Sequence, residues 1–132
     1  MLFLDTFKIG EKLPPNQYSA LELAYIGDAI YEIYVRTMII ADTNCPMKKL
    51  HKEATNLVKA KAQADYFRAI EGILTEEEMA VFKRGRNTNS RPPKNADLID
   101  YKIATGVEAL IGYTYLKGDE DRLNVLLGYL KK

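Results

Sequence analysis

The sequence contains one cysteine, one histidine, no tryptophan, 5 prolines and 8 glycines among its 132 residues. The single cysteine, Cys45, excludes an internal disulfide framework and a zinc site built from cysteines. We expect it to be a partly buried free thiol in a reducing compartment. The single histidine, His51, has no histidine or cysteine at ligand spacing and is interpreted as a surface residue.

Long apolar runs are also absent. The short apolar start of the chain is interrupted by Asp5 and is too short for a signal peptide, and no run approaches the roughly 18 apolar residues of a membrane span. These absences predict a cytoplasmic protein without a membrane partner. The formal net charge of +1 alone indicates no polyanionic partner, so such a partner has to be inferred from how charge is distributed.

The sequence is rich in apolar residues at helical spacing. Hydrophobic residues make up 47% and charged residues 28%, which is typical of a globular protein, and the length suits one domain. The pattern predicts a single all-α domain over residues 1–132, with an irregular arm over 1–18. The helices are expected at 20–41, 46–71, 76–84, 96–117 and 119–131.

Capping residues mark where these helices begin and end. Ser19 is expected to cap the first, and Thr75 with Glu78 forms a capping box that accounts for the acidic run 76–78 without a catalytic role. The other expected boundaries are a turn at 42–44 before Pro46, an N-cap at Asn95, and an end at Lys117 and Gly118.

The segment LELAYIGDAIYE, residues 21–32, places Asp28 directly after Gly27. Its apolar residues are so dense that we expect the helix to be nearly surrounded by protein. A buried carboxylate costs several kcal/mol unless it is paired, and a glycine inside a helix costs about 0.5–1 kcal/mol. Two unfavourable residues side by side indicate a functional site, whereas Glu32 and Arg36, four residues apart, are interpreted as a surface ion pair.

The segment TGVEALIGYTYL, residues 105–116, also places one carboxylate and one glycine in an apolar helix, with Glu108 among apolar residues and Gly112 one turn later. Glycines let helix backbones approach closely. If the two helices cross near Gly27 and Gly112, Asp28 and Glu108 come within reach of one ion. A satisfied buried hydrogen bond is the alternative for either carboxylate alone, but the pair favours a metal, and two carboxylates without histidine or cysteine favour Mg²⁺.

A basic run without any acid occupies KRGRNTNSRPPK, residues 83–94. Its glycine, asparagine, serine and proline residues predict a loop over 83–95. Solvation is the usual role of such a run, but its charge exceeds what solubility needs, which favours contact with a nucleic acid backbone. The candidate RNA-binding residues are Lys83, Arg84, Arg86, Asn87, Arg91 and Lys94.

These segments resemble the signatures of a known family. LELAYIGDAI resembles the ribonuclease III signature Arg-Leu-Glu-Phe-Leu-Gly-Asp-Ala, and ATGVEALIGYTYL resembles the second acidic motif of that family, Asp-Thr-Val-Glu-Ala-Leu-Ile-Gly. The order and spacing agree over nearly the whole chain. An expected lack of a double-stranded RNA-binding domain, together with RGRN at 84–87, resembles the bacterial Mini-ribonuclease III enzymes.

The resemblance implies the ribonuclease III endonuclease-domain fold. It also implies a homodimeric, Mg²⁺-dependent endoribonuclease that cuts double-stranded RNA, with precursor 23S ribosomal RNA as its typical substrate and no nucleotide cofactor. Asp28 and Glu108 match the catalytic metal ligands of the family. Tyr25 matches an aromatic at the dimer contact, with a core aromatic as the alternative.

Two acids of the family are replaced by Ala24 and Thr105, so one or two metal ions per site remain possible. The missing acids also keep two other functions open. One is a non-catalytic ribonuclease III-like scaffold that binds structured RNA, and the other is a helical dimerisation module without an RNA role.

Overall fold

The structure, a computed structural model, describes residues 3–41 and 46–130. These residues form seven α-helices and three short 3₁₀ helices, and they contain no strand, so the all-α prediction is confirmed. The expected turn at 42–44 and Cys45 lie outside the described residues. The elements are α1 (Ile9–Lys12), η1 (Pro15–Gln17), α2 (Ala20–Ala41), α3 (Met47–Val58), α4 (Ala60–Ile70), η2 (Glu71–Ile73), α5 (Glu76–Arg86), α6 (Leu98–Leu116), α7 (Glu120–Leu127) and η3 (Gly128–Leu130).

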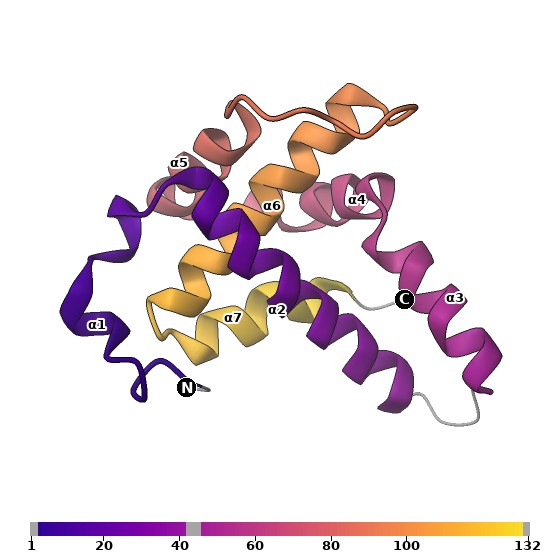
Figure 1. Ribbon diagram of the computed structural model, residues 1–132, viewed down its shortest axis with the longest axis horizontal. Helices are drawn as coiled ribbons and strands as arrows, with labels where there is room; N and C mark the ends of the chain where they lie inside the picture. Colours follow the sequence, from indigo (N-terminus) through magenta and orange to yellow (C-terminus); the bar gives the residue numbers. More distant parts are fainter. Residues whose placement is uncertain (1–2, 42–45, 131–132) are drawn as a thin grey trace.

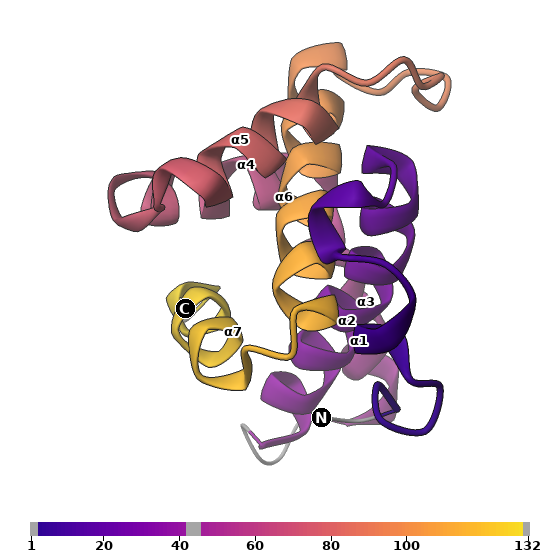
Figure 2. The same ribbon diagram turned by 90° about the vertical axis from the view of Figure 1, so that its left-hand side faces the viewer.

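Helix α6 is the central element of the fold. Helix α2 crosses it on one side, and α5, α4 and α7 pack on the others (Figures 1 and 2). Every residue from Ala104 to Tyr115 is buried except Glu108, which is partly exposed. A helix enclosed on most sides needs apolar residues all round, which explains the dense apolar pattern of this segment.

Helix α2 spans Ala20–Ala41, as predicted, and begins at a capping box. The Ser19 hydroxyl accepts from the Glu22 amide at 3.1 Å, and the Glu22 carboxylate accepts from the Ser19 amide at 2.9 Å. The prediction that this helix is nearly surrounded was wrong. Its partners contact one face, and the other face leaves four large apolar residues exposed, namely Leu21, Tyr25, Ile33 and Ile40.

The predicted continuous helix over 46–71 is in fact two helices, α3 and α4. The chain is extended at Lys59, with φ −61° and ψ 150°, although neither proline nor glycine is present there. Two side chains bond to the carbonyls that end α3. The Tyr31 hydroxyl donates to the Leu57 oxygen at 3.2 Å, and Gln63 Nε2 donates to the Val58 oxygen at 3.0 Å. Tyr31 lies on α2, 26 residues away from Leu57, and local propensity does not reveal such a partner.

Helix α5 extends to Arg86, so part of the predicted basic loop is helical. The Thr75–Glu78 capping box is confirmed, with hydrogen bonds of 2.9 and 3.1 Å. Gly85, which we interpreted as a loop residue, packs against α6. A Cβ at Gly85 would lie 2.8 Å from the Ala109 Cβ and 2.9 Å from the Gly106 Cα. The loop therefore begins at Asn87, after the helix contact has ended.

The remaining boundaries differ in detail from the predictions. Asp97, not Asn95, caps α6 by accepting from the Asp100 amide at 2.9 Å. Asn95 instead adopts a left-handed conformation, with φ 70°. The end of α6 at Lys117 and Gly118 is confirmed, and Gly118 has φ 77°. The arm contains the single turn α1, and the last predicted helix ends at Leu127 before η3.

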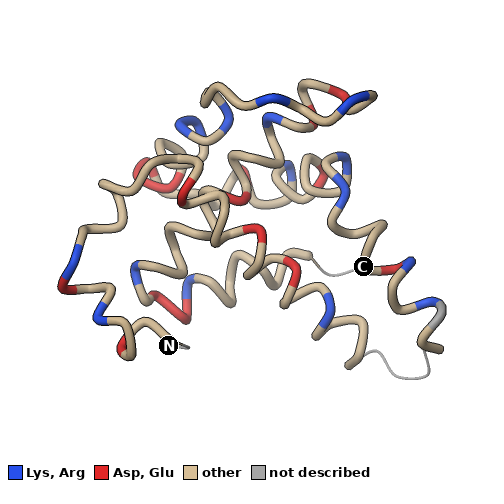
Figure 3. Tube along the Cα trace, viewed as in Figure 1, with Lys and Arg blue, Asp and Glu red and all other residues tan. Residues whose placement is uncertain are grey.

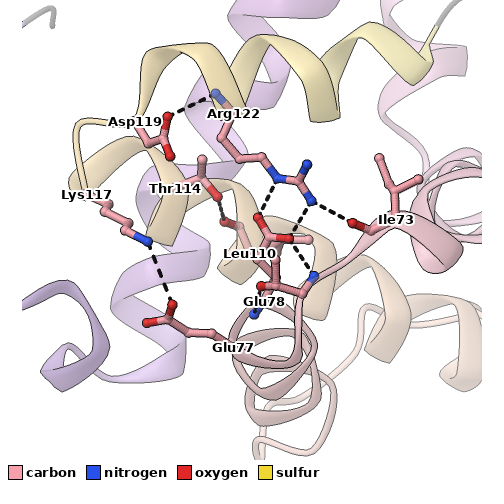
Figure 4. A network of polar contacts seen from close by, with 9 residues as sticks. Ile73, Glu77, Glu78, Leu110, Thr114, Lys117, Asp119 and Arg122 are labelled. Atoms are coloured by element: carbon pink, nitrogen blue, oxygen red, sulfur yellow. Dashed lines mark hydrogen bonds and ion pairs between the residues drawn. The ribbon is translucent and has the colours of Figure 1, made fainter.

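A polar network joins α5 to α7 (Figure 4). Glu78 is only 6% exposed, and its carboxylate accepts from Arg122 Nε at 2.8 Å and from Arg122 Nη2 at 2.7 Å. Arg122 also donates to the Ile73 oxygen at 2.7 Å, while Glu77 bonds to Tyr113. These contacts confirm a structural role for Glu77 and Glu78 of the acidic run.

None of the helices in the described part of the chain is long and apolar enough to cross a membrane.

Candidate active site

Two glycines bring the backbones of α2 and α6 into contact. A Cβ at Gly27 would overlap the Glu108 carbonyl oxygen and lie 2.7 Å from the Gly112 nitrogen. A Cβ at Gly112 would overlap the Leu23 carbonyl oxygen. The predicted crossing near Gly27 and Gly112 is confirmed, because only residues without a side chain permit so close an approach.

The crossing brings Asp28 and Glu108 together. Asp28 is exposed on α2, which corrects the expectation of a buried aspartate, while Glu108 is partly buried on α6. The pKa of Glu108 is raised to about 8 by burial, by the negative charge of Asp28 and by a hydrogen bond shared with Asp28. A hydrogen bond with Gln63 has a smaller effect and lowers the pKa. The proximity of Asp28 and the burial of the site therefore favour the neutral form of Glu108 when no cation is present.

This carboxylate pair suits a divalent cation. A divalent cation held by these carboxylates would supply the opposite charge that favours the ionised form of Glu108. Carboxylate oxygens are the ligands that Mg²⁺ prefers, and Mg²⁺ commonly keeps water in its other positions. Asp28 and Glu108 would hold the ion.

The two positions where the ribonuclease III signatures quoted above have further acids provide no additional ligand. Ala24 and Thr105 are both buried, and the Thr105 hydroxyl donates to the Tyr101 oxygen at 3.0 Å. Within residues 3–41 and 46–130, no cluster of three or more histidine, cysteine, aspartate or glutamate residues could hold a metal. The candidate site therefore has two acidic ligands from the described chain.

Gln63 also contacts the pair, and the sequence interpretation missed it. Gln63 is 3% exposed, and its Nε2 lies 3.5 Å from Glu108 Oε2. It shares the buried face of α4 with Tyr66, Phe67 and Ile70, three, four and seven residues further on. An amide on an otherwise apolar helical face was the signal that could have identified it.

The candidate RNA-binding residues form two groups. Lys83, Asn87, Arg91 and Lys94 are exposed near the connection between α5 and α6, where Figure 3 shows several Lys and Arg positions. Arg84 instead bonds to the arm, donating to the Asn16 oxygen at 3.2 Å and the Tyr18 oxygen at 2.8 Å. Arg86 is half-buried, donates to Asn87 Oδ1 at 3.1 Å and lies 5.8 Å over the ring of Phe82.

The three residues predicted to be surface groups on α2 and α3 are confirmed as such. Arg36 and Glu32 form an ion pair of 2.7 Å with both side chains exposed, and His51 is exposed. An exposed ion pair of this kind contributes little to stability.

Tyr25 is 83% exposed, so the alternative that it is a core aromatic was wrong. It lines an open groove with the side chains of Tyr18, Leu21, Glu22, Ile26 and Leu116. An exposed aromatic in a mostly apolar groove is typical of a surface that a partner covers. This geometry leaves Tyr25 available for the dimer contact that the resemblance implies.

Comparison with known proteins gives consistent matches. A sequence model of the Ribonuclease III domain matches residues 21–119. The chain is 45% identical over 128 residues to the Mini-ribonuclease 3 of a Thermoanaerobacter species, covering 96% of this chain and 90% of the relative. It is 50% identical over 114 residues to the Mini-ribonuclease 3 of Clostridium tetani, covering 85% and 76%. A crystal structure of a protein from Fusobacterium nucleatum superposes with a TM-score of 0.76 at 33% identity, covering 85% of this chain and 90% of that one.

Proposed function

The chain belongs to the ribonuclease III family, and we propose that it is a Mg²⁺-dependent endoribonuclease that matures precursor 23S ribosomal RNA as a homodimer. Family membership makes it an endoribonuclease of the ribonuclease III type, a class that acts on double-stranded RNA. The observation that carries the metal assignment is the meeting of Asp28 and Glu108 at the crossing of α2 and α6.

Asp28 and Glu108 have complementary positions for phosphodiester hydrolysis. Glu108 is held by α6 inside the fold, whereas Asp28 is exposed where a phosphate can approach. When bound, Mg²⁺ activates a water molecule and polarises the scissile phosphate. The close backbone contact at Gly27 and Gly112 fixes the spacing of the two carboxylates before substrate arrives, so little reorganisation is needed.

The RNA surface in this proposal includes Lys83, Arg86, Asn87, Arg91 and Lys94. An A-form duplex is recognised mainly through its phosphates, 2′-hydroxyls and shape. Side chains near the connection between α5 and α6 suit this mode, because the connection can follow the RNA backbone. Arg84 was a sixth candidate, but its two hydrogen bonds to the arm give it a structural role. We expect replacement of Arg84 to affect RNA binding through the position of the arm as well as through charge.

The homodimer in this proposal uses the exposed apolar face of α2 around Tyr25. A two-fold interface places the same patch on both protomers, so each protomer presents one carboxylate pair to the RNA. Tyr25→Glu places a charge in the apolar contact, and we expect it to shift the protein to monomer in sedimentation. Ile33→Glu, at an exposed apolar residue two turns further along α2, is the matched comparison.

The substrate and location follow from the resemblance to Mini-ribonuclease III enzymes. Precursor 23S ribosomal RNA is the substrate that this resemblance implies, which would place the activity in ribosome biogenesis in the cytoplasm. Cleavage of a precursor transcript, with mapping of the new ends, tests this part separately from cleavage of a generic duplex.

The main test is cleavage of duplex RNA with Mg²⁺ and with EDTA. We expect the wild type to cut only with Mg²⁺, and Asp28→Asn and Glu108→Gln to bind the duplex without cutting it. Duplex binding by the wild type without cleavage would contradict the enzyme proposal and support the RNA-binding scaffold. Failure to bind duplex at low salt would support the dimerisation module.

The dependence of duplex affinity on salt concentration tests the proposed RNA surface separately. Each phosphate contact that is removed should lower the slope of log K against log salt by about 1. We expect a lower slope for Arg91→Ala with Lys94→Ala. Lys49→Ala with Lys52→Ala removes the same charge from exposed positions on α3 and should leave the slope unchanged.

A further inference from the structure

The side-chain oxygen of Gln63, Oε1, is buried and has no hydrogen-bond partner. Among residues 3–41 and 46–130 it is the one buried side-chain nitrogen or oxygen atom without a partner. The residue is 3% exposed. A buried polar atom without a partner costs about 1–3 kcal/mol. Native structures contain few such atoms, and each one calls for an explanation.

The orientation of the Gln63 amide is determined by its neighbours. Nε2 lies 3.0 Å from the Val58 oxygen and 3.5 Å from Glu108 Oε2, and both of these atoms accept hydrogen bonds. Turning the amide over would direct Oε1 at two acceptors and leave Nε2 without one. The lack of a partner for Oε1 therefore does not result from an incorrectly oriented amide group.

The break between α3 and α4 delivers Gln63 to the carboxylate pair. Gln63 lies in the first turn of α4, where its backbone amide donates to the Lys59 oxygen at 3.0 Å. Its side chain joins the end of α3 to Glu108 on α6, while Asp28 approaches Glu108 from α2. Three helices thus contribute one side chain each to this cluster.

We propose that Gln63 is a positioning residue of the candidate metal site. Its Nε2 orients the Glu108 carboxylate, and its unpartnered Oε1 would accept a hydrogen bond from water at the ion when one is bound. The inference rests on the proposed function, because it requires an ion at Asp28 and Glu108. Mg²⁺ keeps several of its waters when few protein ligands are present, and those waters need acceptors.

A glutamine suits this role better than a third acid would. It supplies a donor to Glu108 and an acceptor to water while adding no negative charge to two carboxylates that already repel each other. Groups that orient metal ligands in this way typically change metal affinity by about 10–100-fold when they are removed.

The test measures ion binding by the full chain without RNA. Mn²⁺ serves as the probe, because its free concentration can be read by electron paramagnetic resonance. Gln63→Met removes both polar ends of the side chain and keeps its length. We expect a Kd for Mn²⁺ that is about 10–100-fold weaker than that of the wild type.

Tyr66→Phe is the matched control. Tyr66 lies on the same helix and loses a buried hydrogen bond to the Leu126 oxygen, 2.6 Å long, at a site away from the carboxylates. We expect it to lower the melting temperature and to leave the Kd for Mn²⁺ within twofold of the wild type. A purely structural role for Gln63 would give Gln63→Met the same behaviour as Tyr66→Phe, and would overturn the inference.

The cleavage reaction offers a second readout. In the Gln63→Met variant, the Mg²⁺ concentration for half-maximal rate should rise with the Kd, while the rate at saturating Mg²⁺ recovers much of the wild-type value. A loss of rate at every Mg²⁺ concentration, with an unchanged half-maximal concentration, would contradict a positioning role.

Failure of the inference and failure of the proposed function are distinguishable. If the wild type binds no Mn²⁺, or if Glu108→Gln binds it equally well, the metal site itself is wrong. If these two proteins behave as expected and Gln63→Met binds Mn²⁺ with wild-type affinity, only the role of Gln63 is overturned.

A measurement on the wild type covers the case in which Gln63→Met does not fold. The side-chain NH₂ resonances of Gln63 should shift as Mg²⁺ is added and saturate with the same Kd as Mn²⁺-competition experiments give. Resonances that stay in place while the ion binds would overturn the inference.

Discussion

Glu78 and Glu108 are two glutamates that enter the fold from neighbouring helices and meet opposite surroundings. Glu78 on α5 accepts two hydrogen bonds from Arg122, which hold its pKa below the ordinary value. Glu108 on α6 faces Asp28, and burial together with that negative charge raises its pKa to about 8. The charge of the neighbour distinguishes the two, since both lose solvent on folding.

This difference indicates which carboxylate is structural and which is available for chemistry. The charge of Glu78 is already compensated by a guanidinium, so the pair contributes to stability and has little use for an added cation. Glu108 and Asp28 carry uncompensated charge that an added cation would neutralise. A strongly perturbed carboxylate with a like-charged neighbour is typical of functional sites.

The largest expected effect is the loss of cleavage in Glu108→Gln. Metal ligation supplies several kcal/mol of transition-state stabilisation, so we expect a fall in the rate of roughly 10³-fold or more. Single-turnover cleavage of duplex RNA at saturating Mg²⁺ measures it. Glu78→Gln is the control, and its rate per folded molecule should stay within a few-fold of the wild type. Equal losses in both variants would abolish the distinction between the two glutamates.

Gly27→Ala should break the contact that places Glu108 beside Asp28. The added Cβ would overlap the Glu108 carbonyl oxygen, which is backbone and has no freedom to turn away. We expect the free energy of unfolding to fall by about 3 kcal/mol or more, as measured by chemical denaturation. Gly72→Ala is the control, because a Cβ there meets nothing within 4 Å, and it should be neutral or slightly stabilising. Wild-type stability for Gly27→Ala would contradict the crossing.

Glu78→Gln should lower stability without altering the chemistry of the site. It removes the charge from the pair with Arg122 and leaves a partly buried guanidinium without its counterion. We expect a loss of about 2–3 kcal/mol in the free energy of unfolding. Glu32→Gln removes an exposed carboxylate from the pair with Arg36 and should cost no more than about 0.5 kcal/mol. Similar losses in the two variants would show that Glu78 is no more structural than a surface ion pair.

The smallest effect is on the pH dependence of stability in the ion-free protein. The pKa of Glu108 rises on folding from 4.5 to about 8, so its contribution is complete below pH 4.5 and is lost as pH rises through about 8. Glu78 has the opposite sign, because its lowered pKa gives stability that is lost only as pH falls below the unfolded value. Between about pH 6 and pH 8.5 we therefore expect the wild type to lose on the order of 1–2 kcal/mol, discounted because Glu108 is partly exposed.

Thermal unfolding of the wild type and Glu108→Gln in EDTA across that range is the measurement. The variant has no carboxylic acid to titrate at this position, so its melting temperature should change less. Mg²⁺ should restore the stability of the wild type at the higher pH, because Glu108 is then ionised and available to the ion. Parallel curves for the two proteins in EDTA would indicate an ordinary pKa for Glu108.

Much of the fold was predictable because its signals are local. The predicted N-cap at Ser19 and the predicted capping box at Thr75–Glu78 each bond to a residue three positions away, so a short window of sequence contains both partners. The crossing at Gly27 and Gly112 was predictable for a different reason, since glycine in a dense apolar helix has few uses other than close packing. These features led to the helices and to the Asp28–Glu108 pair.

The errors arose where distant partners determine local structure. The break at Lys59 accompanies the hydrogen bond from Tyr31 on α2 to the Leu57 oxygen, and the extension of α5 to Arg86 accompanies the packing of Gly85 on α6. Glycine serves equally well in a loop and in a helix contact, so its identity alone did not distinguish the two. The exposure of Asp28 was missed for a similar reason, because dense apolar composition did not reveal that one face of α2 lacks a covering helix.

The sequence by itself determined that the chain is helical, where most helices begin, which two carboxylates form the candidate site, and which family it resembles. These properties depend on residue type and on spacing along one helix. Only the tertiary structure decided that Glu78 is neutralised by Arg122 and that burial and the charge of Asp28 raise the pKa of Glu108. It also decided that the side-chain oxygen of Gln63 is left without a partner among the described residues. The physical reason is that charge and solvation depend on which side chains meet in space, and residues as far apart as Asp28 and Glu108 meet only when α2 and α6 cross.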